Sequence, residues 1–230
     1  MHKKTKGNLL ITLGILLIAA AVGLAGYNLW DASRAQKAAE EITGQLISDI
    51  ESKVEDGKTA APYIDPNTPM PVEVVDGYEY IGVLEIPSEG LSLPVMKEWD
   101  YTRLKISPCR FTGSYYSDDL VICAHNYMRH LGPLLQIGIG EDIYFTSVDG
   151  LTIHYIVTNR ETVEPTAVEQ MIENSSNSET SLLDWDLTLF TCNLGGQTRC
   201  AVRCSRAADG GTGASDAKQR RGSNSVFDIL

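Results

Sequence analysis

Cys192 and His125 are the two side chains of this sequence that could together carry out nucleophilic catalysis. Cys192 ends the apolar run 188–192 (TLFTC), and His125 ends the apolar run 119–125 (DLVICAH). A cysteine enzyme needs a thiolate, a nearby imidazole that moves protons, and donors for the oxyanion. Both residues lie at or beside the ends of predicted strands, where a rigid scaffold meets loops and functional groups collect. Each run alone is a weak signal, because a cysteine or histidine at a strand end is more often structural.

Arg199 is the candidate for the positive charge at this site. A turn of six residues, 193–198, separates it from Cys192 and would return the chain beside the cysteine. Arg203 shares its strand face but lies four residues further, about 13 Å away at roughly 3.3 Å per residue. We therefore expect Arg199, and not Arg203, to reach the thiol.

The remaining cysteines and histidines are interpreted as structural. The five cysteines are Cys109, Cys123, Cys192, Cys200 and Cys204. An odd number without paired spacing does not resemble a disulfide framework. The absence of a C-x-x-C pair argues against zinc. Strand alternation places Cys200 and Cys204 opposite the Arg199 face, and Cys109 is expected in a loop. The other histidines, His2, His130 and His154, have no companion nucleophile and are given no role.

The region 73–206 is predicted to be mainly β. Short apolar or alternating runs predict seven strands, at 80–86, 91–96, 119–125, 141–148, 151–159, 185–191 and 198–205. Asp149-Gly150, between two of these runs, is a strong signal for a two-residue hairpin. Many short strands with one short helix, at 165–173, predict a closed or nearly closed β-barrel.

Residues 9–30 are predicted to be a transmembrane anchor. The stretch 9–26 carries no charge and, with its flanking residues, supplies about the 20 apolar positions that cross a bilayer. The basic segment 1–8 predicts a cytoplasmic N-terminus, with the rest of the chain outside the cell. A cleaved signal peptide is the alternative, although its apolar region is normally only about 7 to 15 residues long. Cleavage would also leave the body exported.

Segment 31–72 is predicted to be a helical spacer followed by a Pro-rich linker. Ile42, Leu46, Ile50 and Val54 are spaced by four and form a helical stripe. This stripe could pack on the domain, pair with a second copy or belong to a spacer, and we favour the spacer. The four prolines of 59–72 are typical of an extended linker. The Gly/Ser-rich and charged segment 207–230 is predicted to be a disordered tail.

The charge balance argues against a nucleic-acid partner. The chain has 19 Lys and Arg against 30 Asp and Glu, which gives a formal net charge of -11. Proteins that bind a phosphate backbone need a concentrated basic patch. The body of this chain has no such stripe.

The order of these motifs resembles the sortase family. It reads 124–126 (AHN), then 188–192 (TLFTC), then Arg199, and the run 80–87 (YIGVLEIP) resembles the family's first barrel strand. The resemblance covers roughly residues 75–206. It implies a distorted eight-stranded β-barrel with short helices, preceded by the transmembrane helix and helical spacer. It also implies a Cys-His-Arg site at one end, with no metal and no cofactor.

Function and site roles follow from the same resemblance. It implies that Cys192 is the nucleophile, that His125 is the general acid and then base, and that Arg199 orients substrate and stabilises oxyanion charge. Sortases cleave a short sorting signal, commonly of the Leu-Pro-x-Thr-Gly kind, through a thioester. An amine of the cell wall or of a pilin then takes the acyl group. The implied partners are a protein with a sorting signal and that amine acceptor, and the implied location is the cell membrane.

The subclass stays open. Residues 160–185 would form the loop that governs substrate choice, and their segment SSNSETS matches no signal-selecting pattern. Some pilin-building sortases carry a lid with Asp-Pro and an aromatic residue, whereas Asn67 follows Asp65-Pro66 here.

Two alternative functions remain. A thiol hydrolase of the cell wall, an amidase or endopeptidase, usually places its cysteine before its histidine, but catalytic triads are defined by geometry and not by chain order. A membrane-tethered β-domain that binds a partner would keep Cys192 as a core residue.

Overall fold

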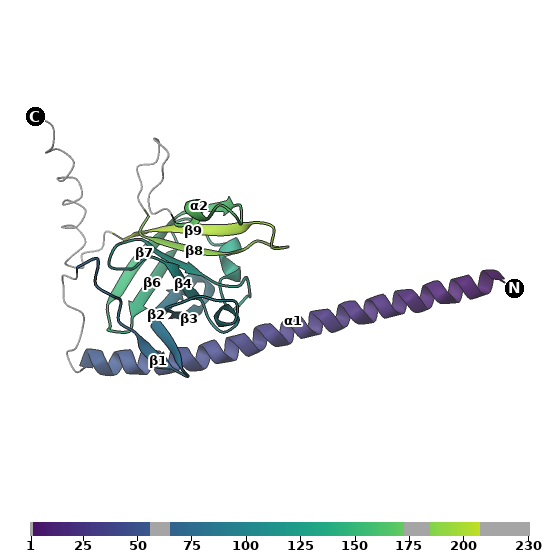
Figure 1. Cartoon of the computed structure of the whole chain (residues 1–230), viewed down its shortest axis with the longest axis horizontal. Coiled ribbons are helices and arrows are strands. Elements are labelled where there is room, and N and C mark those ends of the chain that lie inside the picture. Colours follow the sequence, from purple (N-terminus) through teal and green to yellow (C-terminus); the bar gives the residue numbers. More distant parts are fainter. Residues whose placement is uncertain (1, 56–64, 173–184, 208–230) are drawn as a thin grey trace, which may run out of the picture.

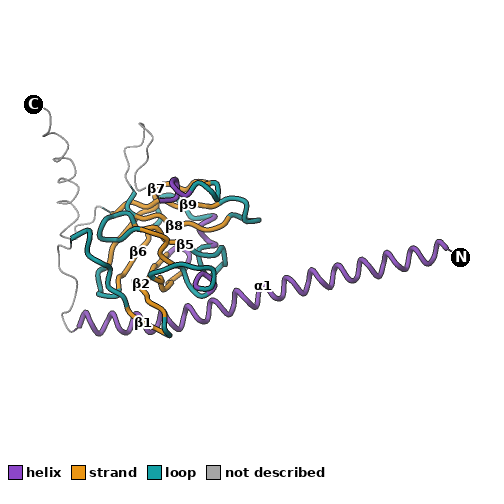
Figure 2. The backbone as a smooth tube through the Cα atoms, viewed as in Figure 1, coloured by secondary structure: helices purple, strands orange, loops and turns teal. Residues whose placement is uncertain are grey.

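The protein is described by a computed structural model over residues 2–55, 65–172 and 185–207, and every structural statement below concerns these ranges. A β-barrel packs beside one long helix, α1 (His2–Glu55), whose N-terminal part extends well beyond the barrel (Figure 1). The barrel contacts the C-terminal part of that helix, as the tube view also shows (Figure 2).

Eight strands close the barrel. In chain order they are β2 (Tyr78–Ile86), β3 (Leu91–Met96), β4 (Cys109–Thr112), β5 (Leu120–Cys123), β6 (Asp142–Ser147), β7 (Thr152–Val163), β8 (Leu187–Cys192) and β9 (Arg199–Arg206). Their order in the sheet is β2-β3-β4-β5-β8-β9-β7-β6, and β6 pairs back with β2. Because the sheet closes on itself, the barrel has no free edge of its own. The predicted eight-stranded barrel is confirmed.

Short elements complete the described fold. Strand β1 (Glu73–Val75) pairs with the start of β2. The 3-10 helices are η1 (Pro87–Glu89), η2 (Arg103–Lys105) and η3 (Gly132–Leu135), and one short α-helix, α2 (Val168–Ile172), follows β7. Strand pairs β3–β4 and β5–β8 are parallel, and the other pairs are antiparallel.

The seven predicted strands are all present, and two further strands were not predicted. Strand β1 has three residues and β4 has four, so neither is long enough to show a periodic pattern. Cys109, which was expected in a loop, begins β4 opposite Cys123 of β5. The hairpin prediction was wrong in length. The Ser147 amide donates to the Leu151 carbonyl, so three residues form the turn, and Gly150 adopts a φ of 86°.

The helical stripe of α1 packs on the barrel, although the sequence led us to favour a free spacer. Ile42, Leu46 and Ile50 are buried against β2 and β3. Full burial of an aliphatic side chain such as Leu46 stabilises a fold by about 1.5–3 kcal/mol. Lys53 then ties the end of the helix to the barrel, because its ammonium donates to the Glu73 carboxylate at 2.6 Å and to the Val148 carbonyl at 3.2 Å.

The N-terminal part of α1 has the length and composition of a membrane span. It contains an 18-residue window with a mean hydropathy of 2.3, and none of that window is buried in the structure. The candidate anchor and the packed stripe therefore belong to one helix. The first part of the predicted linker (59–64) and the tail from 208 onward lie outside the described residues.

Candidate active site

Cys192 and Arg199 are directly opposite each other on neighbouring strands. Cys192 ends β8, Arg199 begins β9, and their Cα atoms are register partners. Both side chains are partly exposed. The strand register therefore agrees with the prediction that the chain returns after the turn to place Arg199 beside Cys192.

The turn 193–198 is closed by its own hydrogen bonds. The Asn193 amide donates to the Thr198 carbonyl at 2.9 Å, and the Asn193 side chain donates to the Thr198 hydroxyl at 2.8 Å. Gly195 and Gly196 have φ values of 86° and 72°, which is the left-handed region that favours glycine. These contacts hold the turn in one shape and so keep Arg199 opposite Cys192.

His125 reaches the same end of the barrel from strand β5. Strands β5 and β8 are parallel, with Cys123 opposite Phe190. The pairing continues past β5, because the Ala124 amide donates to the Phe190 carbonyl at 3.2 Å and the Thr191 hydroxyl donates to the Ala124 carbonyl at 2.9 Å. One residue further along both chains, His125 is level with Cys192. The topology thus brings all three predicted site residues to one edge of three adjacent strands.

The loop after His125 is held in a compact turn. The Leu131 amide donates to the His125 carbonyl at 3.3 Å, and the amides of His130 and Gly132 donate to the Tyr127 carbonyl at 2.9 and 3.0 Å. Gly132 is required by this packing, since a Cβ there would be 2.6 Å from the Tyr127 carbonyl oxygen. The loop therefore has a defined shape that fixes where His125 leaves the strand.

The imidazole of His125 is half-buried and stacked on an aromatic ring. Its centroid is 4.9 Å from that of Tyr127, with 27° between the ring planes. Burial lowers the pKa of His125 below its usual range, Lys105 lowers it further, and the carboxylate of Asp31 opposes both. A lowered pKa favours the neutral imidazole, which can accept a proton from a thiol.

Arg203 is engaged elsewhere. Its side chain is 1% exposed, its Nε donates to the Glu161 carboxylate at 2.8 Å, and its Nη1 donates to the Thr188 hydroxyl at 2.9 Å. Its guanidinium also donates to the carbonyls of α2 and lies 4.8 Å from the centroid of the Trp185 ring. Its environment is that of a structural ion, as expected from its position along the strand.

The other four cysteines are buried. Cys109, Cys123, Cys200 and Cys204 are each at most 4% exposed, and none forms a disulfide. Burial raises the pKa of all four thiols, that of Cys123 to about 12. They therefore stay protonated at neutral pH, whereas Cys192 reaches the surface at the end of its strand.

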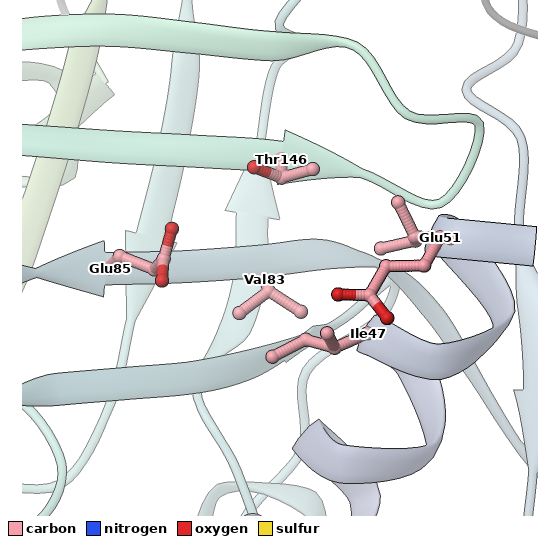
Figure 3. A pocket seen from close by; sticks show the side chains of 6 residues that line it. Ile47, Glu51, Val83, Glu85 and Thr146 are labelled. Carbon is pink, nitrogen blue, oxygen red and sulfur yellow. The ribbon is translucent and has the colours of Figure 1, made fainter. Parts of the chain in front are cut away.

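A pocket on another face of the barrel contains no comparable chemistry. It lies between α1 and the strands β2 and β6, where Glu51, Glu85 and Thr146 surround Val83 (Figure 3). Its lining residues include no cysteine and no histidine. Across the described ranges, no group of three or more His, Cys, Asp or Glu side chains is placed to hold a metal ion.

The sequence reasoning missed the aromatic and acidic neighbours of His125. Tyr127 is two residues from the histidine, and an aromatic residue so close could have been noted as a stacking partner. Asp31, whose carboxylate accepts a hydrogen bond from the Tyr127 hydroxyl at 3.0 Å, gave no signal. It lies 96 residues away, next to the predicted anchor. Only the fold brings it to the loop.

Comparison with protein families finds a match to the Sortase domain. The matched segment, residues 84–207, is more than half of the 230-residue chain. It includes His125, Cys192 and Arg199. A comparison with curated proteins finds no match.

The fold is similar to several solved sortase structures. Sortase C1 from Streptococcus agalactiae has 21% identity and a TM-score of 0.47, with 58% of this chain and 70% of that chain covered. Sortase C from Clostridium perfringens SM101 has 19% identity and a TM-score of 0.47, covering 76% and 94%. Sortase C-3 from Streptococcus pneumoniae has 20% identity and a TM-score of 0.48, covering 77% and 89%.

Proposed function

This chain belongs to the sortase family, and on that basis we propose that it is a membrane-anchored cysteine transpeptidase with Cys192 as nucleophile. The substrate is a protein with a sorting signal of the Leu-Pro-x-Thr-Gly kind, and the acceptor is an amine of the cell wall or of a pilin. The observation that carries the assignment of residues is the convergence of three strand ends. His125 continues β5, Cys192 ends β8 and Arg199 begins β9, so acid-base, nucleophilic and cationic groups share one edge.

Acylation uses all three groups. As the Cys192 sulfur attacks the scissile carbonyl carbon, its proton passes to His125, and negative charge develops on the carbonyl oxygen. Arg199 is the register partner of Cys192, and its guanidinium is the cation available to stabilise that charge. When the tetrahedral intermediate collapses, the amide nitrogen leaves with the proton of His125, and the peptide remains as a thioester.

Deacylation runs in the opposite sense. The acceptor amine attacks the thioester carbon, and His125 takes the proton that this nitrogen loses. Collapse forms the new amide bond and expels the Cys192 thiolate, which regains the proton from His125. Acylation and deacylation each begin when the neutral ring of His125 accepts a proton. The half-buried position of His125 favours that neutral form, because burial lowers its pKa.

The location follows from the helix. We propose that residues 9–30 span the cell membrane with the N-terminus in the cytoplasm, and that the barrel is extracellular. Whether the enzyme anchors surface proteins or builds polymers depends on which signal and which amine it accepts.

The test is product analysis with the full chain in detergent micelles. A panel of sorting-signal peptides is incubated with and without amine acceptors, and mass spectrometry follows both the peptide and the protein. We expect a peptide adduct on Cys192 and an amide product that appears only when an amine is present. Hydrolysis that ignores the amine would favour the thiol hydrolase instead. The absence of any adduct, with a Cys192 that iodoacetamide labels only after denaturation, would favour the binding domain.

A further inference from the structure

Tyr127 connects the catalytic edge of the barrel to helix α1. Its ring stacks on the imidazole of His125 at a centroid distance of 4.9 Å, and its hydroxyl donates to the Asp31 carboxylate at 3.0 Å. Asp31 directly follows the predicted membrane span and is 18% exposed at its side chain. A continuous chain of contacts therefore runs from the membrane end of the helix to the proposed acid-base residue.

The ring of Tyr127 is held on more than one side. His130 is fully buried, and its ring centroid is 5.4 Å from that of Tyr127. In the described parts of the chain, neither ring nitrogen of His130 has a hydrogen-bond partner, so this ring acts as a packing surface. Two amides of the same loop bond the Tyr127 carbonyl, which fixes its backbone as well.

His125 has no hydrogen bond from another side chain among the contacts that the structure gives. A ring without such a partner depends on stacking for its orientation, and Tyr127 supplies the stacked face. Metal-binding and catalytic histidines are commonly oriented by a third group that bonds their second nitrogen. Here an aromatic face takes the place of that third group.

The charges around His125 come from three elements. Lys105 of η2 disfavours the imidazolium and Asp31 of α1 favours it. His130 lies in the loop after β5, where burial and then His125 lower its pKa. Arg34 of α1 forms an ion pair with Asp31 at 3.2 Å and so reduces the negative charge that His125 experiences. Asp31 is the one carboxylate in this set.

We propose that Tyr127 and Asp31 are positioning residues for His125, with Asp31 holding the Tyr127 ring against the imidazole. The role of His125 in this statement rests on the proposed function. Neither Tyr127 nor Asp31 contacts the reacting atoms. Their effect is to fix the plane of the ring and the balance between its neutral and charged forms.

The test uses three substitutions in the full chain in micelles. Asp31→Asn keeps a hydrogen-bond acceptor and removes the charge, Tyr127→Phe removes the hydroxyl and keeps the ring, and Tyr127→Leu removes the stacked face. Tyr101→Phe is the matched control, because Tyr101 is 76% exposed and lies outside this set. Asp49→Asn is the control for an exposed carboxylate on the same helix.

The main readout is the titration of His125, followed by NMR of carbon-13-labelled histidine and assigned with a His125→Gln variant. Asp31→Asn removes a negative charge that favours the imidazolium, so the midpoint must move to lower pH. Any pH limb of kcat/KM that reports His125 must move in the same direction. Tyr127→Leu should lower kcat by about 10- to 100-fold with KM within about twofold, since small misplacements of a catalytic group carry that cost. Tyr127→Phe should recover part of this loss, because it keeps the stacked ring but loses the hydrogen bond to Asp31.

The outcomes separate this proposal from the proposed function. If the His125 titration is unchanged in both Asp31→Asn and Tyr127→Leu, the proposal is overturned, whatever happens to turnover. If the titration shifts as expected but the unsubstituted protein transfers no acyl group, the coupling is supported and the proposed function fails. Equal losses in the two control variants would also overturn it, because the effect would then be nonspecific.

Discussion

The β8–β9 hairpin holds two arginines on one face of β9, and their environments are opposite. Next to the turn, Arg199 faces Cys192, is partly exposed, and donates at 3.1 and 3.3 Å to the carbonyls of Gly196 and Thr198. Four residues along, Arg203 faces Thr188 and is 1% exposed, with a carboxylate, a hydroxyl and two carbonyls as partners.

The difference shows how one strand can serve stability and chemistry at once. A buried charge must be fully paired, because desolvation costs several kcal/mol per ion. Arg203 meets that condition with four hydrogen bonds to protein groups, one of them to the Glu161 carboxylate. Among the described residues, the guanidinium of Arg199 has hydrogen bonds only to carbonyls of its own turn, and these contacts can be exchanged for a developing oxyanion at little cost. Position along the strand, and not residue type, separates the two roles.

The largest expected effect comes from the turn end of the hairpin, where Cys192 lies. Cys192→Ala should abolish acyl transfer while the thermal unfolding midpoint stays within a few degrees, because the side chain is not part of the core. In the unsubstituted folded protein, iodoacetamide should label Cys192 alone, since burial raises the pKa of the other four thiols. Peptide mapping by mass spectrometry checks both points. Cys123→Ala is the control, and residual transfer in Cys192→Ala would contradict the assignment.

Arg199→Ala should lower the acylation rate by about 10²–10³-fold, the usual loss for one oxyanion donor. Unfolding should be unaffected, because the guanidinium bonds only the turn. Arg199→Lys keeps the charge without the planar fork and should recover part of the rate. Stopped-flow measurement of thioester formation gives the rate, and full activity of Arg199→Ala would remove the arginine from the site.

Arg203→Met should have the opposite effects: a large loss of stability and little change in turnover. Removing one partner of a buried pair costs about 3–5 kcal/mol, and we expect about 2–3 kcal/mol here because Glu161 is 39% exposed. Turnover per folded molecule should change little. Urea unfolding and active-site titration measure the two quantities. Lys97→Met, which breaks an exposed pair with Glu79, is the control and should cost at most about 1 kcal/mol. An Arg203 variant that folds normally but cannot acylate would reverse the comparison.

The smallest effect is expected at the seam, by which we mean the contact between β5 and β8, the strands that lead to His125 and Cys192. Thr191→Val removes the buried hydrogen bond from its hydroxyl to the Ala124 carbonyl, at a cost of about 1–2 kcal/mol. Turnover should fall by a few fold, because His125 directly follows Ala124. Thr146→Val removes an exposed hydroxyl contact and serves as the control. Equal turnover in the two variants would show that the seam does not position His125.

Local patterns predicted seven strands in a closed or nearly closed barrel, and they predicted the pairing of Cys192 with Arg199, whereas the eight-stranded form was implied by the resemblance to sortases. Alternation along β9 correctly predicted that Cys200 and Cys204 are buried, but Ala201 and Arg203 on its other face are buried as well. The length of one turn predicted which arginine meets the cysteine. Strand β4 was missed because its four residues show no period, and it is defined by pairing with β5. The apolar stripe of α1 was visible, but a stripe does not specify what covers it. The contact between Asp31 and Tyr127 joins distant parts of the chain and has no local signature.

Because α1 is continuous, it sets the height of the active site above the membrane surface. The helix runs without interruption through the apolar window, past Asp31 and under the barrel to Glu55. At about 1.5 Å per residue, the nine residues from the end of the proposed span at 30 to buried Ala39 cover only about 14 Å. With residues 9–30 in a bilayer, the catalytic edge near Asp31 lies close above the lipid headgroups. A substrate that is itself tethered to the membrane would then reach the enzyme by lateral diffusion within the membrane. A sorting signal held far above the membrane surface would not reach the active site.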